Sequence, residues 1–331
     1  SCHTGKQITA SGLQRKDFQT EVNGQHTDLF TLSNKQGMEV CITNYGARVV
    51  SILVPDRNGK REDVVCGFST ITEYMEQRQN FGSTVGRYIG RILNARFTLD
   101  GVEYKLVPNN GKSGHISHGG NPGFADRIWK VEQADTHRVR LSYLSPDGEN
   151  GFPGNLKVTL VYSLGEDDNA LDLTYEATTD APTVLNLSHH SFFNISGNFT
   201  KSVEDQQLWV DADRFTPYDD KKCVTGEYLP VAGTPLDFRM PHTIGECIDA
   251  DHPQLKVVNG YDHTWELNTK GDDTRPAAWV YDPASGRKME IFTTEPGMQI
   301  YTGNGLKGKM TGKGGIAYPF RSAVCFETMH F

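Results

Sequence analysis

Six polar residues make up the part of this sequence that is best suited to chemistry. In chain order they are Arg91, His118, His190, Asp262, Gln299 and Glu327. Imidazole side chains gain and lose protons near neutral pH, where a carboxylate is ionised. Two imidazoles and a carboxylate can therefore move two protons to and from water-like groups at neutral pH. The set predicts acid–base chemistry.

The local sequence distinguishes three of these residues from the other titratable groups of the chain. His118 is followed by two glycines, which let a substrate approach closely. His190 is flanked by Phe192 and Phe193, whose faces could pack on a substrate. Glu327 ends an apolar run, where a carboxylate is costly to bury without a purpose or a partner. A structural salt bridge to an arginine is the alternative interpretation of Glu327.

Two further patterns suggest a nucleotide or a metal, but their contexts argue against both. Gly303–Gly308 matches G-x-G-x-x-G, which binds a dinucleotide only when the glycines open a helix. Residues 309–315 are too rich in glycine to form that helix, so we predict a loop. His189 and His190 are adjacent, and adjacent side chains on a strand point to opposite faces. They therefore cannot share a metal ion.

The bulk composition is that of a globular protein with an acidic balance. The 331 residues are 37% hydrophobic and 22% charged, with a formal net charge of −8 and no basic run. This charge repels nucleic acids and anionic membranes, and a phosphorylated substrate would need a local basic pocket. No apolar stretch approaches the roughly 20 residues of a membrane-spanning helix. We expect a neutral small-molecule substrate, no nucleic-acid partner and no membrane span.

Apolar residues that alternate with polar ones dominate the sequence and predict half-buried β-strands. The alternation is clearest over residues 138–143, 157–164 and 171–176. Residues 100–101, Asp-Gly, form a two-residue hairpin signal between two further strands. The best helix candidate spans residues 70–78 and has a threonine cap. The pattern predicts an all-β chain folded as a large antiparallel β-sandwich.

No low-complexity linker, charge block or internal repeat divides the chain. We predict a single domain over residues 1–331, with about residues 1–10 as a mobile N-terminal tail. The six cysteines are widely spaced, without the spacing of metal ligands, and five of them are predicted to be buried thiols.

Cys2 is the sixth cysteine and has a different context. A small residue followed by cysteine, ahead of a polar segment, resembles the cleavage junction of a bacterial lipoprotein. This interpretation predicts a lipid anchor at Cys2 and a periplasmic or lipoprotein location. A trimmed or tag-derived terminus on a cytoplasmic protein is the alternative.

Six short segments, taken in order, resemble those of the aldose 1-epimerase (galactose mutarotase) family. They are residues 86–92, 118–120, 186–194, 260–263, 296–304 and 326–328. The resemblance extends over nearly the whole chain and also includes residues 44–47, 54–56 and 145–154. It implies a large antiparallel β-sandwich with a sugar cleft on a concave face. The implied reaction interconverts the anomers of free hexoses such as galactose and glucose, and it requires neither a metal nor an organic cofactor.

By position, the resemblance implies a role for each of the six polar residues. Glu327 corresponds to the general base, His190 to the general acid, and His118 to a second imidazole at the ring oxygen or the anomeric oxygen. The groups that bind sugar hydroxyls correspond to Arg91, Asp262 and Gln299.

The sequence departs from the family's pattern at several positions. Gly90 stands where Asn is common before the substrate arginine, which removes a hydrogen bond to the sugar and leaves the epimer preference open. Ser117 replaces Leu and His189 replaces Asn, and neither bears on the implied proton transfers. Relatives continue for another strand or two where this chain ends at Phe331, which predicts either a truncation or the absence of those strands.

Two alternative functions remain open at this level. A hexose-6-phosphate 1-epimerase would need a cluster of Arg or Lys around the sugar 6-position. A non-catalytic carbohydrate-binding protein would keep the aromatic residues but would have no need of Glu327 together with His190. The preferred aldose and the oligomeric state also stay open.

Overall fold

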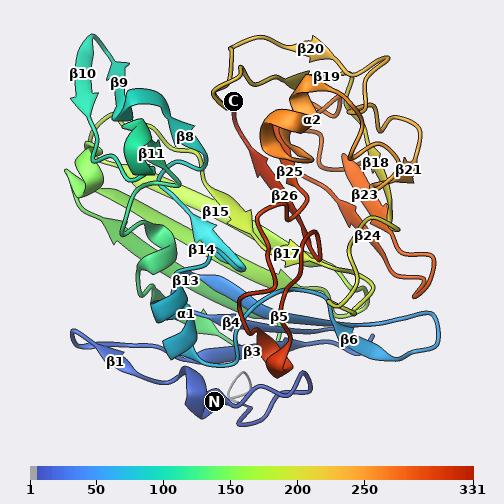
Figure 1. Ribbon diagram of the computed structural model, residues 1–331. Helices are drawn as coiled ribbons and strands as arrows, with labels where there is room; N and C mark the ends of the chain where they lie inside the picture. Colours follow the sequence, from blue (N-terminus) through green and yellow to red (C-terminus); the bar gives the residue numbers. More distant parts are fainter. Residues whose placement is uncertain (1–5) are drawn as a thin grey trace. The chain divides into compact units, whose positions relative to one another are not determined.

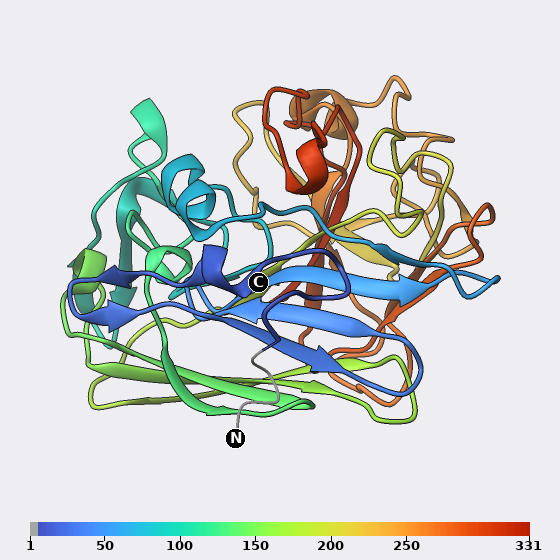
Figure 2. The ribbon, with the colours of Figure 1, turned by 90° about the horizontal axis from the view of Figure 1, so that it is seen from below.

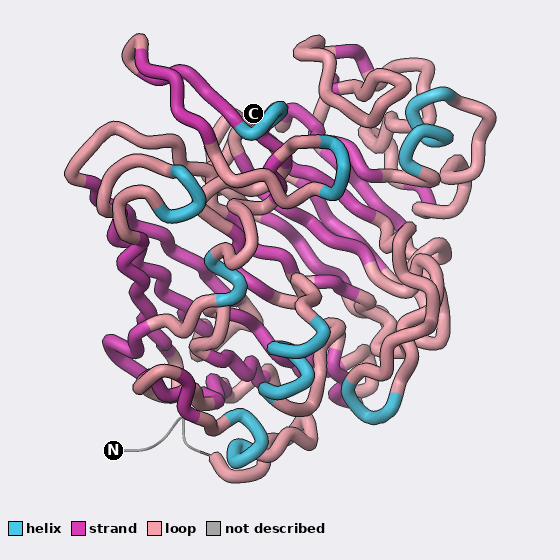
Figure 3. The backbone as a smooth tube through the Cα atoms, turned by 60° about the vertical axis from the view of Figure 1, so that its left-hand side comes forward, coloured by secondary structure: helices cyan, strands magenta, loops and turns pink. Residues whose placement is uncertain are grey.

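The structure of the protein is a computed structural model that describes residues 6–331. Its regular structure is almost entirely β-strand, with a few short helices between the strands (Figure 3). Within the described residues the chain forms two compact units. Unit 1 comprises residues 6–54, 61–63 and 67–189, and unit 2 comprises residues 55–60, 64–66 and 190–331. The single domain over residues 1–331 stays a prediction.

Unit 1 is built from β-strands, most of which pair antiparallel. They are β1 (Glu21–Val22), β2 (Gln25–His26), β3 (Leu29–Ser33), β4 (Glu39–Thr43), β5 (Arg48–Pro55), β6 (Arg61–Asp63), β7 (Ser83–Val85), β8 (Arg91–Ile92), β9 (Arg96–Leu99), β10 (Val102–Lys105), β11 (Ile116–Ser117), β12 (Lys130–Ala134), β13 (Arg138–Ser145), β14 (Leu156–Leu164), β15 (Leu171–Thr179) and β16 (Ser188–His190). Two four-stranded sheets, β3-β4-β5-β6 and β12-β13-β14-β15, are blue and green in Figures 1 and 2. Strand pairs β1-β2, β8-β11, β9-β10 and β7-β16 accompany them. The boundary between the two units falls within β16, so that its last residue, His190, belongs to unit 2.

The long strands of unit 1 confirm the predicted alternation. β14 buries Val158, Leu160, Tyr162 and Leu164, and the residues between them are exposed or half-buried. β13 and β15 cover the other two predicted stretches, although β15 buries its apolar side chains only in part. Because side chains of a strand point alternately to its two faces, apolar residues at every second position give one inward face.

The predicted hairpin and helix are also present in unit 1. β9 and β10 pair around Asp100 and Gly101, which have φ values of 52° and 77°. Two consecutive positive φ angles are what a type I′ turn requires. Helix α1 (Ile71–Gln77) begins after Thr70, whose side chain accepts a 3.2 Å hydrogen bond from the Glu73 backbone N–H. This bond satisfies one of the unpaired donors of the first helical turn.

Unit 2 contains a six-stranded antiparallel sheet and a four-stranded one. Its strands are β17 (Phe192–Phe193), β18 (Gln207–Val210), β19 (Arg214–Thr216), β20 (Leu229–Pro230), β21 (His242–Thr243), β22 (Asp262–Glu266), β23 (Ala278–Tyr281), β24 (Lys288–Ile291), β25 (Gly297–Tyr301) and β26 (Val324–Met329). The sheet orders are β17-β26-β25-β22-β19-β20 and β21-β18-β23-β24. One hydrophobic core, with Trp265 and Phe238 among its buried side chains, takes residues from both sheets.

The helix α2 (Pro253–Val258), which lies in unit 2, was not predicted from the sequence. It begins after His252, whose Nδ1 accepts a 3.2 Å hydrogen bond from the Gln254 backbone N–H. Ser, Thr, Asp and Asn are the usual capping residues, so a histidine cap gave no recognisable start signal. None of the helices in the described part of the chain has the length and hydrophobicity of a membrane span.

The prediction about the cysteines needs correction. Cys41, Cys66 and Cys325 are buried as expected, but Cys223 and Cys247 are only half-buried, because they lie in loops. Near the start of the described chain, the backbone N–H of Ala10 donates to Glu39 at 2.8 Å. The mobile tail over about residues 1–10 stays a prediction. The suggested lipid anchor at Cys2 lies outside the described residues.

Candidate active site

The six-stranded sheet of unit 2 gathers several predicted site residues on one face. In its register Glu327 on β26 lies opposite Gln299 on β25, and Gln299 lies opposite Thr264 on β22. Directly opposed residues share a face of an antiparallel sheet, and so do residues two apart on one strand. Asp262 therefore belongs to the same face. Trp265, Met298, Ile300 and Phe326, which alternate with these positions along the same strands, belong to the hydrophobic core.

His190 contacts Glu327 at this face. Its Nε2 lies 3.0 Å from Oε1 of Glu327, and its ring stacks on Phe192 at a centroid distance of 5.1 Å. Both residues are almost fully buried, with exposed fractions of 7% for His190 and 3% for Glu327. Phe192 on β17 is paired with Cys325, two residues before Glu327, so the β17–β26 pairing sets the approach of the imidazole. The buried carboxylate thus has an imidazole as a partner.

Two opposing effects act on the pKa of His190. Burial favours the neutral ring and by itself would lower the pKa. The charge of Glu327 and the hydrogen bond to it raise the pKa, and the charge of Asp262 adds to this effect. Together the carboxylates outweigh burial, and the pKa of His190 lies above its ordinary value. The pair is therefore biased towards imidazolium beside carboxylate.

Asp262 and Gln299 hold each other on the same face. Gln299 donates from Nε2 to Oδ1 of Asp262 at 2.7 Å, and Thr264 donates from Oγ1 to Oε1 of Gln299 at 3.4 Å. The amide of Gln299 therefore has a defined orientation, with its nitrogen towards the carboxylate. A carboxylate and an amide placed in this way are suited to binding hydroxyl groups.

Arg91 and His118 are neighbours in unit 1. Arg91 on β8 is paired with Ser117 on β11, and His118 follows directly. The backbone N–H of His118 donates to the carbonyl of Gly90 at 2.9 Å, and the backbone N–H of Gly90 donates to Nδ1 of His118 at 3.1 Å. Because Nδ1 accepts this bond, the proton of the neutral ring lies on Nε2. His118 is thus set up to donate through Nε2.

Two residues that the sequence did not single out hold the turn that carries His118. Asn150 donates from Nδ2 to the carbonyls of Gly119 and Pro122 at 3.0 and 2.8 Å. Arg87 is buried and donates to several carbonyls of residues 145–154, the loop to which Asn150 belongs. Both residues lie inside segments that carry the family resemblance, but their contacts depend on the folded loops. No spacing rule could have found them.

The predicted site residues thus fall in two groups. Arg91 and His118 belong to unit 1, and the other four belong to unit 2: His190, Asp262, Gln299 and Glu327. Among residues 6–331, no group of three or more His, Cys, Asp or Glu side chains is arranged to hold a metal ion.

Three smaller predictions can also be compared with the structure. Phe193 does not share the face of Phe192 and packs against the hydrophobic core, so its suggested role in packing on a substrate is wrong. The ring of His189 contacts that of Tyr162, and both residues belong to unit 1. Gly303–Gly308 forms a loop with no α-helix after it, as predicted.

The chain is similar to known proteins over most of its length. A family model described as aldose 1-epimerase matches residues 28–331. A galactose mutarotase from Sus scrofa is 39% identical over 302 residues, which are 91% of this chain and 85% of that protein. An aldose 1-epimerase from Escherichia coli (strain K12) is 36% identical over 286 residues, which are 86% of this chain and 81% of that protein.

A solved structure shares the fold. The galactose 1-epimerase from Lactobacillus acidophilus NCFM superimposes with a TM-score of 0.81 and is 29% identical. The match covers 94% of this chain and 88% of that chain.

Proposed function

This chain belongs to the aldose 1-epimerase family, and we propose that it interconverts the α and β anomers of free hexoses such as galactose and glucose. The enzyme is an isomerase of the mutarotase type. The observation that carries the proposal is the buried contact between Nε2 of His190 and Oε1 of Glu327, within a chain that matches this family from residue 28 to residue 331.

The proposed reaction opens and closes the sugar ring. Glu327, ionised, takes the proton of the C1 hydroxyl, and His190, protonated, gives a proton to the ring oxygen. The bond between C1 and the ring oxygen breaks, which leaves an open aldehyde. Rotation about the C1–C2 bond presents the other carbonyl face, and the two proton transfers then run in reverse. Each closure restores the ionised Glu327 and the protonated His190, so no proton is gained or lost overall.

The geometry of the pair suits this reaction. The two oxygens that exchange protons are both bonded to C1 and therefore lie close together. A base and an acid whose reactive atoms lie 3.0 Å apart can each address one of them. The raised pKa of His190 keeps the acid protonated while the carboxylate beside it remains available as the base.

The remaining roles follow from the family resemblance. We assign Asp262 and Gln299 to the binding of sugar hydroxyls, which the 2.7 Å bond between them and their place on the face of Glu327 support. Arg91 is assigned to hydroxyl binding and His118 to donation from Nε2 to a sugar oxygen. For these two residues the assignment rests on the resemblance and on the His118 tautomer. No metal or organic cofactor takes part in the proposed steps.

The fold supports the same family assignment. We infer that the antiparallel sheets are arranged as the large β-sandwich that the resemblance implies, and that the chain acts as one domain. The continuous match of the family model over residues 28–331 and the TM-score of 0.81 support both inferences.

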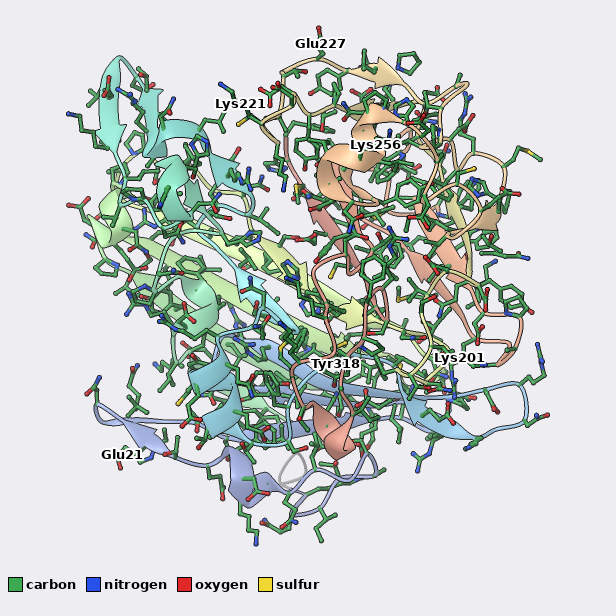
Figure 4. The ribbon with its side chains drawn as sticks, in the orientation of Figure 1. Glu21, Lys201, Lys221, Glu227, Lys256 and Tyr318 are labelled. Atoms are coloured by element: carbon green, nitrogen blue, oxygen red, sulfur yellow. The ribbon has the colours of Figure 1, made fainter. Side chains whose placement is uncertain are left out.

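A neutral sugar fits the chain better than a phosphorylated one. The net charge is −8, and a sugar phosphate would need a local group of cations. In unit 2 the exposed side chains of Lys201, Lys221 and Lys256 lie well apart from one another (Figure 4). These three lysines therefore do not form such a group.

Polarimetry of freshly dissolved sugar tests the proposal. We expect the protein to accelerate the optical rotation change of α-D-galactose and α-D-glucose above the spontaneous rate. Acceleration confined to glucose 6-phosphate would support the sugar-phosphate enzyme. Tight binding of sugar without any acceleration would support the non-catalytic binding protein.

A further inference from the structure

Arg321 is a buried arginine of unit 2 that the proposed reaction does not use. Its exposed fraction is 2%, and its φ of 55° lies in the left-handed region that side chains rarely adopt. Such a backbone conformation persists only where the surrounding contacts fix it.

The guanidinium of Arg321 donates to two carboxylates and to two neutral groups. The carboxylates are those of Glu204 and Asp249, at 2.9 and 3.0 Å from Nη1. The neutral acceptors are the carbonyl of Asn259, at 2.9 Å from Nη2, and Oδ1 of Asn304, at 3.2 Å from Nε. The carboxylates balance the buried charge. The two neutral acceptors connect Arg321 with the segment that precedes Asp262.

Asn304 connects Arg321 with the residue before Asp262. Its Oδ1 accepts from Arg321, and its Nδ2 donates to the carbonyl of Tyr261 at 2.9 Å. Thr302 supports the same peptide, because its backbone N–H donates to that carbonyl and its Oγ1 accepts from the Tyr261 backbone N–H, both at 3.2 Å. The backbone that enters β22 at Asp262 is therefore held by side chains from the loop after β25.

The second neutral acceptor holds the same segment from the other end. Asn259 directly follows helix α2, three residues before Asp262, and Arg321 donates to its carbonyl. Gly260, between them, has a φ of 139°, and a Cβ there would lie 2.3 Å from Oδ1 of Asn304. The chain passes so close to Asn304 that only glycine fits. Residues 259–261 are thus held at both ends by one arginine and its partner.

We propose that Arg321 and Asn304 are positioning residues that fix the backbone of Asp262, so that its carboxylate meets Gln299 and the sugar hydroxyls in the correct place. Neither residue touches the sugar in this proposal. It rests on the proposed function, because it assumes that Asp262 binds substrate. Gln299 orients the carboxylate directly, and the Arg321–Asn304 pair holds the chain from which that carboxylate projects.

Two variants separate positioning from general stability. Asn304→Asp keeps the shape and the acceptor for Arg321, but it places an oxygen against the carbonyl of Tyr261, where Nδ2 now donates. Arg321→Lys keeps the charge but cannot reach Asn304 and Asn259 together. The matched control is Arg287→Met. Arg287 is also a buried arginine of unit 2, and it binds backbone carbonyls away from β22.

Steady-state mutarotation of galactose, measured well below each melting temperature, gives the readout. We expect Asn304→Asp and Arg321→Lys to raise KM by about 10- to 100-fold, the scale of a small misplacement, with a smaller effect on kcat. The pH limits of activity should not move, because the His190–Glu327 pair is untouched. Arg287→Met should lower the melting temperature and leave KM unchanged. Circular dichroism checks that each variant is folded. If one of the two variants does not fold, the KM of the other tests the proposal.

The outcomes distinguish this proposal from the proposed function. A wild-type protein that accelerates no aldose would remove the function and the positioning role together. An active wild type whose KM rises in Asp262→Asn, but stays unchanged in both Asn304→Asp and Arg321→Lys, would overturn the positioning role alone. An equal rise of KM in the Arg287→Met control would also overturn it, because any loss of stability would then have the same effect.

Discussion

At the scale of single residues, the proposed chemistry depends on which of two adjacent histidines meets Glu327. His190 does so at 3.0 Å, whereas the ring of His189 contacts Tyr162 in unit 1. The difference follows from the alternation of side chains along an extended chain. Stacking on Phe192 then holds the imidazole of His190 in the plane that places Nε2 at the carboxylate.

Exchanging each histidine for asparagine tests this assignment. We expect His190→Asn to lose at least about 100-fold in kcat, the lower part of the usual contribution of a general acid. His189→Asn restores the residue that is common in the family and should leave kcat nearly unchanged. Polarimetric rates of the two purified variants give the comparison. Reversed effects would mean that the acid has been assigned to the wrong residue.

The pH dependence of the rate follows from the same pair. Activity needs a protonated His190 and an ionised Glu327, so the profile of kcat/KM should be bell-shaped. The pKa of His190 is raised, so its proton is lost only above the ordinary value of about 6.5 for histidine. The basic limb should therefore lie above that value, and the acid limb appears where the pair takes up a further proton. A basic limb at or below 6.5 would contradict the influence of Glu327 on His190.

At the scale of secondary-structure elements, the sequence predicted those features that depend on only a few neighbouring residues. The Asp100-Gly101 turn and the Thr70 cap act within a few residues, so both were visible in the sequence. The cap of α2 was missed because His252 fills a position that another residue type usually occupies. Phe193 was misassigned because the strand that decides its face, β17, is only two residues long and shows no alternation of its own.

The cap of α1 offers a test at this scale. Thr70→Ala removes the acceptor for the Glu73 N–H and should lower the free energy of unfolding by about 1 kcal/mol. Urea unfolding measures this change. Thr70→Ser keeps the hydroxyl and is the matched control, which should lose much less. Equal losses in the two variants would show that the methyl group, and not the cap, stabilises the helix.

At the scale of the whole molecule, the order of short segments identified the family, but the geometry of the candidate site could be seen only in the folded sheet. Glu327, Gln299 and Thr264 come together only because β26, β25 and β22 are neighbours in a particular register. Registers are set by distant pairing and cannot be read from a single strand. For the same reason, the contacts of Arg321 and Asn304 could not be predicted from the sequence, because they join loops from four parts of unit 2.

The most direct test of the central claim is the mutarotation rate of Glu327→Gln beside that of the wild type. Glutamine keeps the shape of the side chain and its contact with His190 but cannot take the C1 proton. Polarimetry of freshly dissolved α-D-galactose at neutral pH should show a fall in kcat of at least about 100-fold, with KM largely retained. A Glu327→Gln protein that turns over galactose at close to the wild-type rate would contradict the claim that Glu327 is the base.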